Sequence, residues 1–296
     1  MGTSLPHMLL QGMYGCGKST LAYIIANEMG SDITVINAAC IEHYKDILEV
    51  ILNVNQHDIV FIDEVHALST QFEESLYLVM EDFKINLPRE FDLMFSLKGV
   101  GDIKKFEPKD IPTFTLIGGT TNIGIISGPF FTRFKSNYYL QKYSIDDLAK
   151  IAETNAKKLS LSLSHEMALE IAKRSKGVPR ILNSRLEWIN EYRVGKNIST
   201  VTLQTVLDAF ELADVNKEGL EINDMAYLKV VEECQPIGLE SIASMTNLSK
   251  ETITKYIEPY FTDIGVIEIT RGGRILRGGV YGKDSKQNFY EQMKNL

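Results

Sequence analysis

The first half of the chain alternates short apolar runs with stretches whose apolar residues recur at helical spacing. The run DIVFID at 58–63 is continuous and rich in β-branched residues, which is typical of a parallel strand buried on both faces. The pattern predicts strands at 7–11, 33–37, 58–63 and 113–118, and helices at 19–29, 46–54 and 73–83. Strands and helices that alternate in this way predict an α/β domain with a parallel sheet over residues 1–143.

The pattern changes after residue 143. Ser144 is a candidate N-cap for an amphipathic run that ends near residue 159. Further helical patterns at 164–175, 179–193 and 202–213 predict a small helical domain over 144–214. In 215–296 the expected order is helices at 224–233, 239–246 and 250–263, then two short apolar segments around a Gly-rich turn. Three helices followed by a β-hairpin are the order of a winged helix.

Composition excludes several classes of protein. The chain has 296 residues, 44% hydrophobic and 24% charged, which excludes disordered and collagen-like chains. No apolar run approaches the roughly 20 residues that span a bilayer, and the first residues lack the features of a secretory signal. The cysteines, which lie far apart, favour neither a disulfide framework nor a zinc site (Cys16, Cys40 and Cys234). We therefore expect a cytoplasmic protein without a membrane contact.

The net charge of −8 taken alone disfavours a nucleic-acid partner, because phosphates attract basic surfaces. The distribution of the charge weakens that argument. Residues 32–110 hold 16 acidic and 7 basic side chains, whereas 269–286 hold five basic and one acidic. The acidic balance therefore describes the body of the protein, and the C-terminal hairpin is locally basic.

Residues 12–19, GMYGCGKS, match the phosphate-binding pattern G-x-x-x-x-G-K-[ST] between a predicted strand and a predicted helix. Glycines let backbone N–H groups surround phosphate oxygens, and the helix N-terminus adds partial positive charge. Lys18 is expected to reach the β- and γ-phosphates of ATP, and Ser19 to bind Mg²⁺. The alternative is a chance Gly-rich turn. The expected nucleotide contacts in this segment are Gly12, Gly15, Cys16, Gly17, Lys18, Ser19 and Thr20.

A second motif follows 45 residues after Lys18, where the strand at 58–63 ends in two carboxylates. Asp63 is expected to hold the Mg²⁺ shell, and Glu64 to act as the base that polarises water. The alternative, a strand that ends in a solvated acidic turn, would be preferred for this motif alone. The preceding phosphate loop favours the metal and base roles.

Longer segments resemble the RuvB family, the Holliday-junction branch-migration motors of the AAA+ class. The resemblance rests on LPHMLLQGMYGCGKSTLAYIIANEMG, FIDEVHALSTQFEESLYLVMEDFKI, PTFTLIGGTTNIG, RSKGVPRILN, VNKEGLEINDMAYL and IGLESIASMTNLSKETITKYIEPYFTDIGVI, in order along the chain. It implies an AAA+ domain (1–143), a helical lid (144–214) and a winged helix (215–296). It also implies ATP hydrolysis, a hexameric ring, duplex DNA at a four-way junction, and a RuvA-like partner.

The resemblance assigns further roles. Thr120 and Thr121 match the sensor-1 region near the γ-phosphate, and Arg133 matches an arginine finger that reaches the neighbouring subunit's site. Lid residues Pro179 and Arg180 match the sensor-2 segment, and Tyr143 matches a tyrosine near the adenine. Without the family context, ordinary structural roles would be preferred: strand-end capping, a surface ion pair, a helix start and a core aromatic.

The winged helix supplies the expected DNA contacts. Arg271, Arg274 and Arg277 surround a Gly-Gly turn, where a hairpin tip places arginines against phosphates without reading sequence. Lys250 begins the helix at which the family has a basic DNA contact. The alternative is a solvated hairpin with no ligand.

Five departures from the family pattern are visible. The chain begins 11 residues before Gly12, where the family has a longer segment that packs on the adenine. Either the adenine pocket is incomplete or Met1 is not the natural start. The run at 83–112 is about nine residues longer than in the family by visual comparison, and it includes the RuvA-docking hairpin. Phe131 and Asn122 replace arginines, and Ile269 replaces a basic residue at the wing.

Two other functions stay open at this point. A clamp-loader-like or initiator-like AAA+ machine would load a partner onto DNA without translocating. A nucleotide-switched DNA-binding regulator would use the winged helix and need no hydrolysis. The intact Asp63, Glu64 and Arg133 favour a motor over such a regulator.

Overall fold

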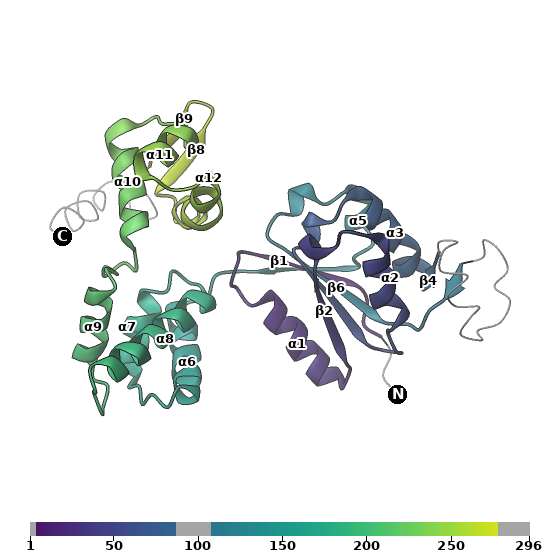
Figure 1. The fold of residues 1–296 in the computed structure, drawn as a ribbon, viewed down its shortest axis with the longest axis horizontal. Coiled ribbons are helices and arrows are strands. Elements are labelled where there is room, and N and C mark those ends of the chain that lie inside the picture. The colour runs from purple at the N-terminus through teal and green to yellow at the C-terminus, as the bar shows by residue number, and fades with distance from the viewer. Residues whose placement is uncertain (1–3, 87–107, 278–296) are drawn as a thin grey trace. The chain divides into compact units, whose positions relative to one another are not determined.

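In a computed structural model, which describes residues 4–86 and 108–277, the chain forms two compact units that divide after Tyr143 (Figure 1). The first unit contains a five-stranded parallel sheet with the order β2-β3-β6-β1-β7. Its strands are β1 (Met8–Gly12), β2 (Ile33–Asn37), β3 (Ile59–Asp63), β6 (Thr115–Thr120) and β7 (Ser136–Leu140). The predicted α/β class with a parallel sheet is confirmed.

Helices connect the strands. They are α1 (Lys18–Met29), α2 (Tyr44–Leu52), α3 (Thr70–Asp82) and α5 (Gly128–Phe131), with 3₁₀ turns η1 (Ala38–Cys40), η2 (Val65–Ala67) and η3 (Ile123–Ile125). Strand β7 was absent from the sequence prediction. A two-stranded antiparallel pair, β4 (Lys84–Ile85) with β5 (Lys109–Asp110), lies at the base of the long insertion. Most of the long run at 83–112, from residue 87 to residue 107, lies outside the described residues.

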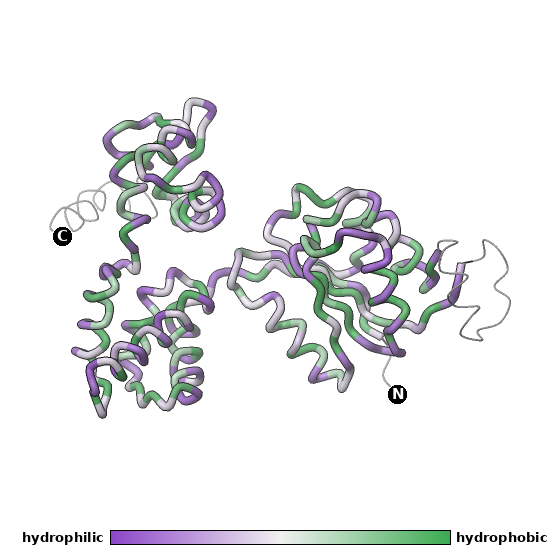
Figure 2. Tube along the Cα trace, viewed as in Figure 1, coloured by the Kyte–Doolittle hydropathy of each residue, from purple (hydrophilic) through white to green (hydrophobic). Residues whose placement is uncertain are grey.

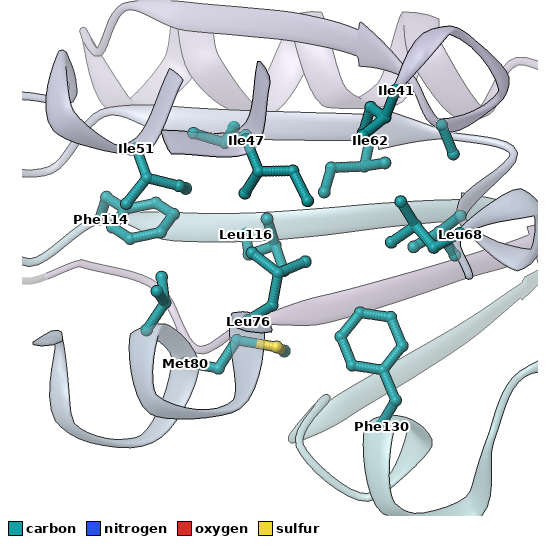
Figure 3. Close-up of a cluster of buried hydrophobic side chains, with 14 of the residues drawn as sticks. Ile41, Ile47, Ile51, Ile62, Leu68, Leu76, Met80, Phe114, Leu116 and Phe130 are labelled. Carbon is teal, nitrogen blue, oxygen red and sulfur yellow. The ribbon is translucent and has the colours of Figure 1, made fainter. Parts of the chain in front are cut away.

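The sheet is buried on both faces because successive side chains of a strand point to opposite sides. On one face, Val60 and Ile62 of β3 and Leu116 of β6 pack with α2, α3 and α5. Figure 3 labels Ile62 and Leu116 in this cluster. On the other face, Ile59, Phe61 and Ile117 pack against α1. Figure 2 shows the apolar character of these central strands. The layers therefore hold the carboxyl ends of β1, β3 and β6 side by side.

The second unit begins with four helices that bury one apolar cluster. They are α6 (Ile145–Lys158), α7 (His165–Lys173), α8 (Pro179–Gly195) and α9 (Leu203–Leu212). The side chain of Ser144 accepts a hydrogen bond from the backbone N–H of Asp147, so the predicted N-cap is confirmed.

A second apolar cluster follows in the same unit, built from helices and a hairpin. The elements are α10 (Ile222–Cys234), α11 (Leu239–Thr246), α12 (Lys250–Thr252), the π-helical turn η4 (Ile253–Ile257), α13 (Glu258–Asp263), β8 (Ile267–Thr270) and β9 (Gly273–Leu276). The helix predicted at 250–263 is continuous but changes its hydrogen bonding before Pro259, which has no backbone N–H to donate. The order of elements agrees with the predicted winged helix.

Lys176 in the loop before α8 pairs with Asp224 of α10, and both side chains are more than nine-tenths buried. Arg185 of α8 pairs with Glu221 at 2.6 Å. These pairs join the two clusters of the second unit.

Among the described residues, no helix is long and apolar enough to cross a membrane. The predicted boundaries between the three domains, at 143/144 and 214/215, remain a prediction.

Candidate nucleotide site and nucleic-acid interface

The phosphate loop connects β1 to α1, and its backbone requires glycine. Gly17, the N-cap of α1, has a φ of 92° in the left-handed region. At Gly12, a Cβ would lie 2.7 Å from the backbone oxygen of Leu140 on the neighbouring strand β7. The first turn of α1 contains no acidic residue, so its N–H groups face no competing carboxylate on their own turn. The loop has the conformation and charge that suit a phosphate.

Lys18 is buried within this loop. Its ammonium donates hydrogen bonds to the backbone oxygens of Gly12 at 3.0 Å and Met13 at 3.3 Å. Burial lowers the pKa of Lys18, while the nearby carboxylates of Glu64 and Asp63 act in the opposite direction. The lysine and both acidic residues are therefore close enough to interact, as their predicted common site requires.

Asp63 ends β3, and Glu64 follows in the left-handed region with φ 50° and ψ 44°. An Asp63 carboxylate oxygen accepts the backbone N–H of Glu64 at 3.0 Å. The Thr121 hydroxyl, at the end of β6, donates to the Glu64 carboxylate at 3.1 Å. The structure thus brings together Lys18, Asp63, Glu64 and Thr121, which lie in three separate segments of the sequence.

Thr120 is placed differently from Thr121. It is fully buried, and its hydroxyl accepts the backbone N–H of Asn122 at 3.1 Å. It also lies 3.0 Å from Nδ1 of His66, which is 3.2 Å from the Glu64 carboxylate. Thr120 is therefore linked to Glu64 through His66, whereas its neighbour Thr121 contacts the Glu64 carboxylate directly. His66 was missed by the sequence analysis, although its place two residues after Glu64 was an available signal.

Ser19 and Asp63 suit a divalent cation chemically, since a hydroxyl and a carboxylate are hard oxygen ligands. Among the described residues, no cluster of three or more His, Cys, Asp or Glu side chains could hold a metal by itself. Mg²⁺ at P-loop sites is typically held by one or two protein oxygens together with substrate phosphates. The two residues therefore fit a cation that arrives with the nucleotide.

The remaining nucleotide candidates divide between the units. Tyr143 places its hydroxyl 3.6 Å from the position that a Cβ on Gly17 would occupy, so it lies beside the loop. Cys16 is completely buried, which suits its interpretation as a small filler. Pro179 and Arg180 begin α8 in the second unit, with the proline in the first turn, where its missing N–H costs nothing.

Arg133, the candidate finger, follows α5. Its guanidinium carbon lies 3.8 Å from the centre of the Tyr77 ring on α3. One terminal nitrogen lies 3.1 Å from the Glu81 carboxylate, and the other donates to the backbone oxygen of Pro129 at 2.6 Å. These partners in its own chain, Tyr77 and Glu81, were not identified from the sequence.

The winged-helix candidates differ in their surroundings. Arg271 lies in the exposed turn between β8 and β9. Lys250 pairs with Glu240 and Arg277 with Glu268, and both basic side chains are more than half exposed. The wing residues Lys283 and Lys286 lie outside the described residues.

The sequence analysis expected Arg274 at the hairpin tip beside DNA, but the structure places its side chain differently. It belongs to β9, two residues before Leu276, so both side chains point to the core side of the hairpin. Its guanidinium donates to the buried Glu258 carboxylate at 2.7 and 3.2 Å. Tyr227 donates to the same carboxylate at 3.1 Å. Arg274 is therefore a part-buried arginine held by a buried carboxylate, and we leave it out of the proposed DNA contacts.

Three family models match consecutive segments of the chain. They are the Holliday junction DNA helicase RuvB P-loop domain at residues 1–140, the RuvB AAA lid domain at 143–216, and the RuvB C-terminal winged helix domain at 217–279. Together they extend over nearly the whole chain, including the phosphate loop, the start of α8 and the hairpin.

Curated relatives and solved structures agree with these matches. The Holliday junction branch migration complex subunit RuvB of Helicobacter acinonychis is 38% identical over 92% of this chain and 79% of that protein. Its counterpart in Campylobacter fetus is 37% identical over 99% and 84%. A structure of a Thermotoga maritima RuvB mutant matches with a TM-score of 0.80 and 30% identity over 97% of this chain and 89% of that one. The chain therefore belongs to the RuvB family of AAA+ P-loop ATPases.

Proposed function

We propose that the protein is an ATP-driven motor that moves duplex DNA at four-way junctions, acting as a hexameric ring with Mg²⁺ and ATP. The observation that carries this proposal is the convergence of Lys18, Asp63, Glu64 and Thr121 at the carboxyl edge of the sheet. In a chain with RuvB-type lid and winged-helix segments, that arrangement supports hydrolysis coupled to movement on DNA. A RuvA-like protein is the proposed partner at the junction.

Each residue has a definite task in this proposal. The backbone of the phosphate loop and Lys18 bind the phosphates, and Ser19 and Asp63 hold the cation that accompanies them. Glu64 accepts the proton of the attacking water, and Thr121 orients the Glu64 carboxylate through their hydrogen bond. Arg133 of one subunit stabilises the charge that develops on the γ-phosphate in the next, and Arg180 couples that site to the lid.

DNA would be bound by Arg271, Arg277 and Lys250 through phosphates, without reading base sequence. The proposed direction of coupling is from hydrolysis, through the lid, to the winged helix. The ion pairs Lys176–Asp224 and Arg185–Glu221 support this route because they join the two parts of the second unit.

Hydrolysis and strand movement are measured together with the purified full chain, ATP, Mg²⁺ and a synthetic four-way junction. Lys18→Ala and Glu64→Gln should each reduce the hydrolysis rate at least ~100-fold and abolish movement of the junction. Lys158→Ala, which removes an exposed lysine of α6, is the matched control. Hydrolysis without any movement of the junction would favour a loading machine over a motor, and unchanged hydrolysis in Lys18→Ala would overturn the site assignment.

A further inference from the structure

Helix α3 presents one row of polar side chains to the segment that carries Arg133. Glu73, Tyr77 and Glu81 are spaced by four residues, so they lie on one face of the helix. This face packs against α5, which begins after Ser127 and leads directly into Arg133. The three side chains therefore lie along the segment that runs from Ser127, the N-cap of α5, to Arg133.

The contacts along this row are consecutive. Glu73 accepts the backbone N–H of Ser127 at 3.4 Å, and the Tyr77 hydroxyl lies 3.4 Å from the Ser127 hydroxyl. The Tyr77 ring stacks on Phe130 with 6.2 Å between ring centres. Because Phe130 is fully buried, the ring of Tyr77 is fixed on that side by the core.

Arg133 also packs on the Tyr77 ring. Its guanidinium lies 3.8 Å from the Tyr77 ring centre, in the geometry of a cation–π contact. Glu81, one turn further along α3, holds a terminal nitrogen at 3.1 Å. Each terminal nitrogen of an arginine carries two N–H donors, so these contacts do not exhaust the guanidinium.

We propose that Tyr77 and Glu81 are positioning residues for Arg133, which hold its guanidinium on α3 in the place from which it serves the neighbouring subunit. This inference rests on the finger role of Arg133 under the proposed function. A flexible arginine would have to be ordered during each catalytic cycle, whereas a stacked and paired one is already ordered.

The test compares steady-state ATP hydrolysis of the full chain with duplex DNA for Tyr77→Leu, Tyr77→Phe, Glu81→Gln and Arg133→Ala. Tyr77→Leu removes the aromatic platform and should lower kcat by about tenfold to a hundredfold, with KM for ATP changed less than about threefold. Tyr77→Phe keeps the ring and should recover most of that loss. Glu81→Gln, on a half-exposed side chain, should lower kcat by about threefold to tenfold.

A purely structural role is distinguished by two further measurements. The double variant Tyr77→Leu with Arg133→Ala should be no slower than Arg133→Ala alone, because the platform acts only through the arginine. Glu74→Gln, which alters an exposed carboxylate of α3 outside this row, should match the parent protein. A further loss in the double variant, or parental kcat in both Tyr77→Leu and Glu81→Gln, would overturn the inference.

The same variants distinguish a failure of this inference from a failure of the proposed function. If Arg133→Ala retains the parental kcat, Arg133 is not a finger and both statements fail. If Arg133→Ala loses activity while Tyr77→Leu and Glu81→Gln do not, only the positioning role fails. If Tyr77→Leu lowers the melting temperature, the comparison of Glu81→Gln with Glu74→Gln decides the question.

Discussion

Acidification should destabilise the first unit through His7, which is buried at the start of β1. Its Nδ1 accepts the backbone N–H of Leu116 at 2.8 Å, and its Nε2 donates to the backbone oxygen of Met80 at 3.1 Å. The neutral ring therefore ties the sheet to α3. Burial lowers the pKa of His7 from 6.5 to about 4, the hydrogen bond to Met80 opposes this, and Lys135 adds a small further lowering.

The direction in which pH changes the free energy of unfolding follows from proton binding by His7. Below pH 6.5 the unfolded chain protonates His7, whereas the folded chain does so only near pH 4, so acid favours unfolding within that window. The pKa difference is worth about 3 kcal/mol when the window has been crossed completely. Between pH 7.5 and 5.5 the expected loss in the free energy of unfolding is about 1.4 kcal/mol.

Native-state hydrogen exchange in urea, followed by mass spectrometry, measures this loss in peptides from β1 and β6 after correction for intrinsic exchange. The single tryptophan, Trp188 in α8, reports the second unit by fluorescence and serves as an internal control. His7→Gln removes the titrating group, so the difference between parent and variant cancels the carboxylates that titrate in the same range. Parallel pH dependence in the parent and in His7→Gln would refute the reasoning.

Three further predictions concern the core, the loop and the hairpin. Leu76→Ala in the fully buried cluster should lower the free energy of unfolding of the first unit by about 3–5 kcal/mol in urea titrations. Gly12→Ala should abolish ATP binding in calorimetry, because its Cβ would lie 2.7 Å from the Leu140 oxygen. Arg274→Ala should destabilise the winged helix by about 3–5 kcal/mol, because it leaves the Glu258 carboxylate as a buried unpaired charge. Arg271→Ala should leave the melting temperature unchanged. It should reduce the slope of the logarithm of the DNA-binding constant against the logarithm of the salt concentration by about one. Equal melting temperatures for the two arginine variants would contradict this distinction.

Elements with strong apolar periodicity were predictable from the sequence. The predicted bounds of β2 and α11 agree with the structure, and those of α1 and β3 differ by one residue. Strand β7 was missed because it is an edge strand of sequence SNYYL, whose side chains are largely exposed, so no apolar run marks it. Periodicity reports burial, and an edge strand buries little.

The local sequence also did not identify contacts between residues that lie far apart in the chain. Tyr77 and Glu81 precede Arg133 by more than fifty residues, and only the packing of α3 on α5 brings them together. His66 lies in the turn η2, and its contact with Thr120, the last residue of β6, is what links it to the site. By contrast, the phosphate-loop motif can be recognised from the sequence because its residues are contiguous and the backbone requires its glycines.

The hairpin shows why a count of charges predicts a DNA surface only in part. Arg274 contributes to the local positive balance in the sequence, yet its charge is neutralised by a carboxylate that is 4% exposed. Lys250 and Arg277 also have carboxylate partners, but these pairs are exposed, and solvent and salt screen such pairs strongly. A phosphate can replace an exposed carboxylate partner at little cost, whereas replacing Glu258 would leave a buried charge behind. The proposed DNA surface therefore consists of Arg271 together with Lys250 and Arg277, whose exposed carboxylate partners a phosphate can replace. Arg274, paired with the buried Glu258, instead fixes the hairpin that presents Arg271 and Arg277.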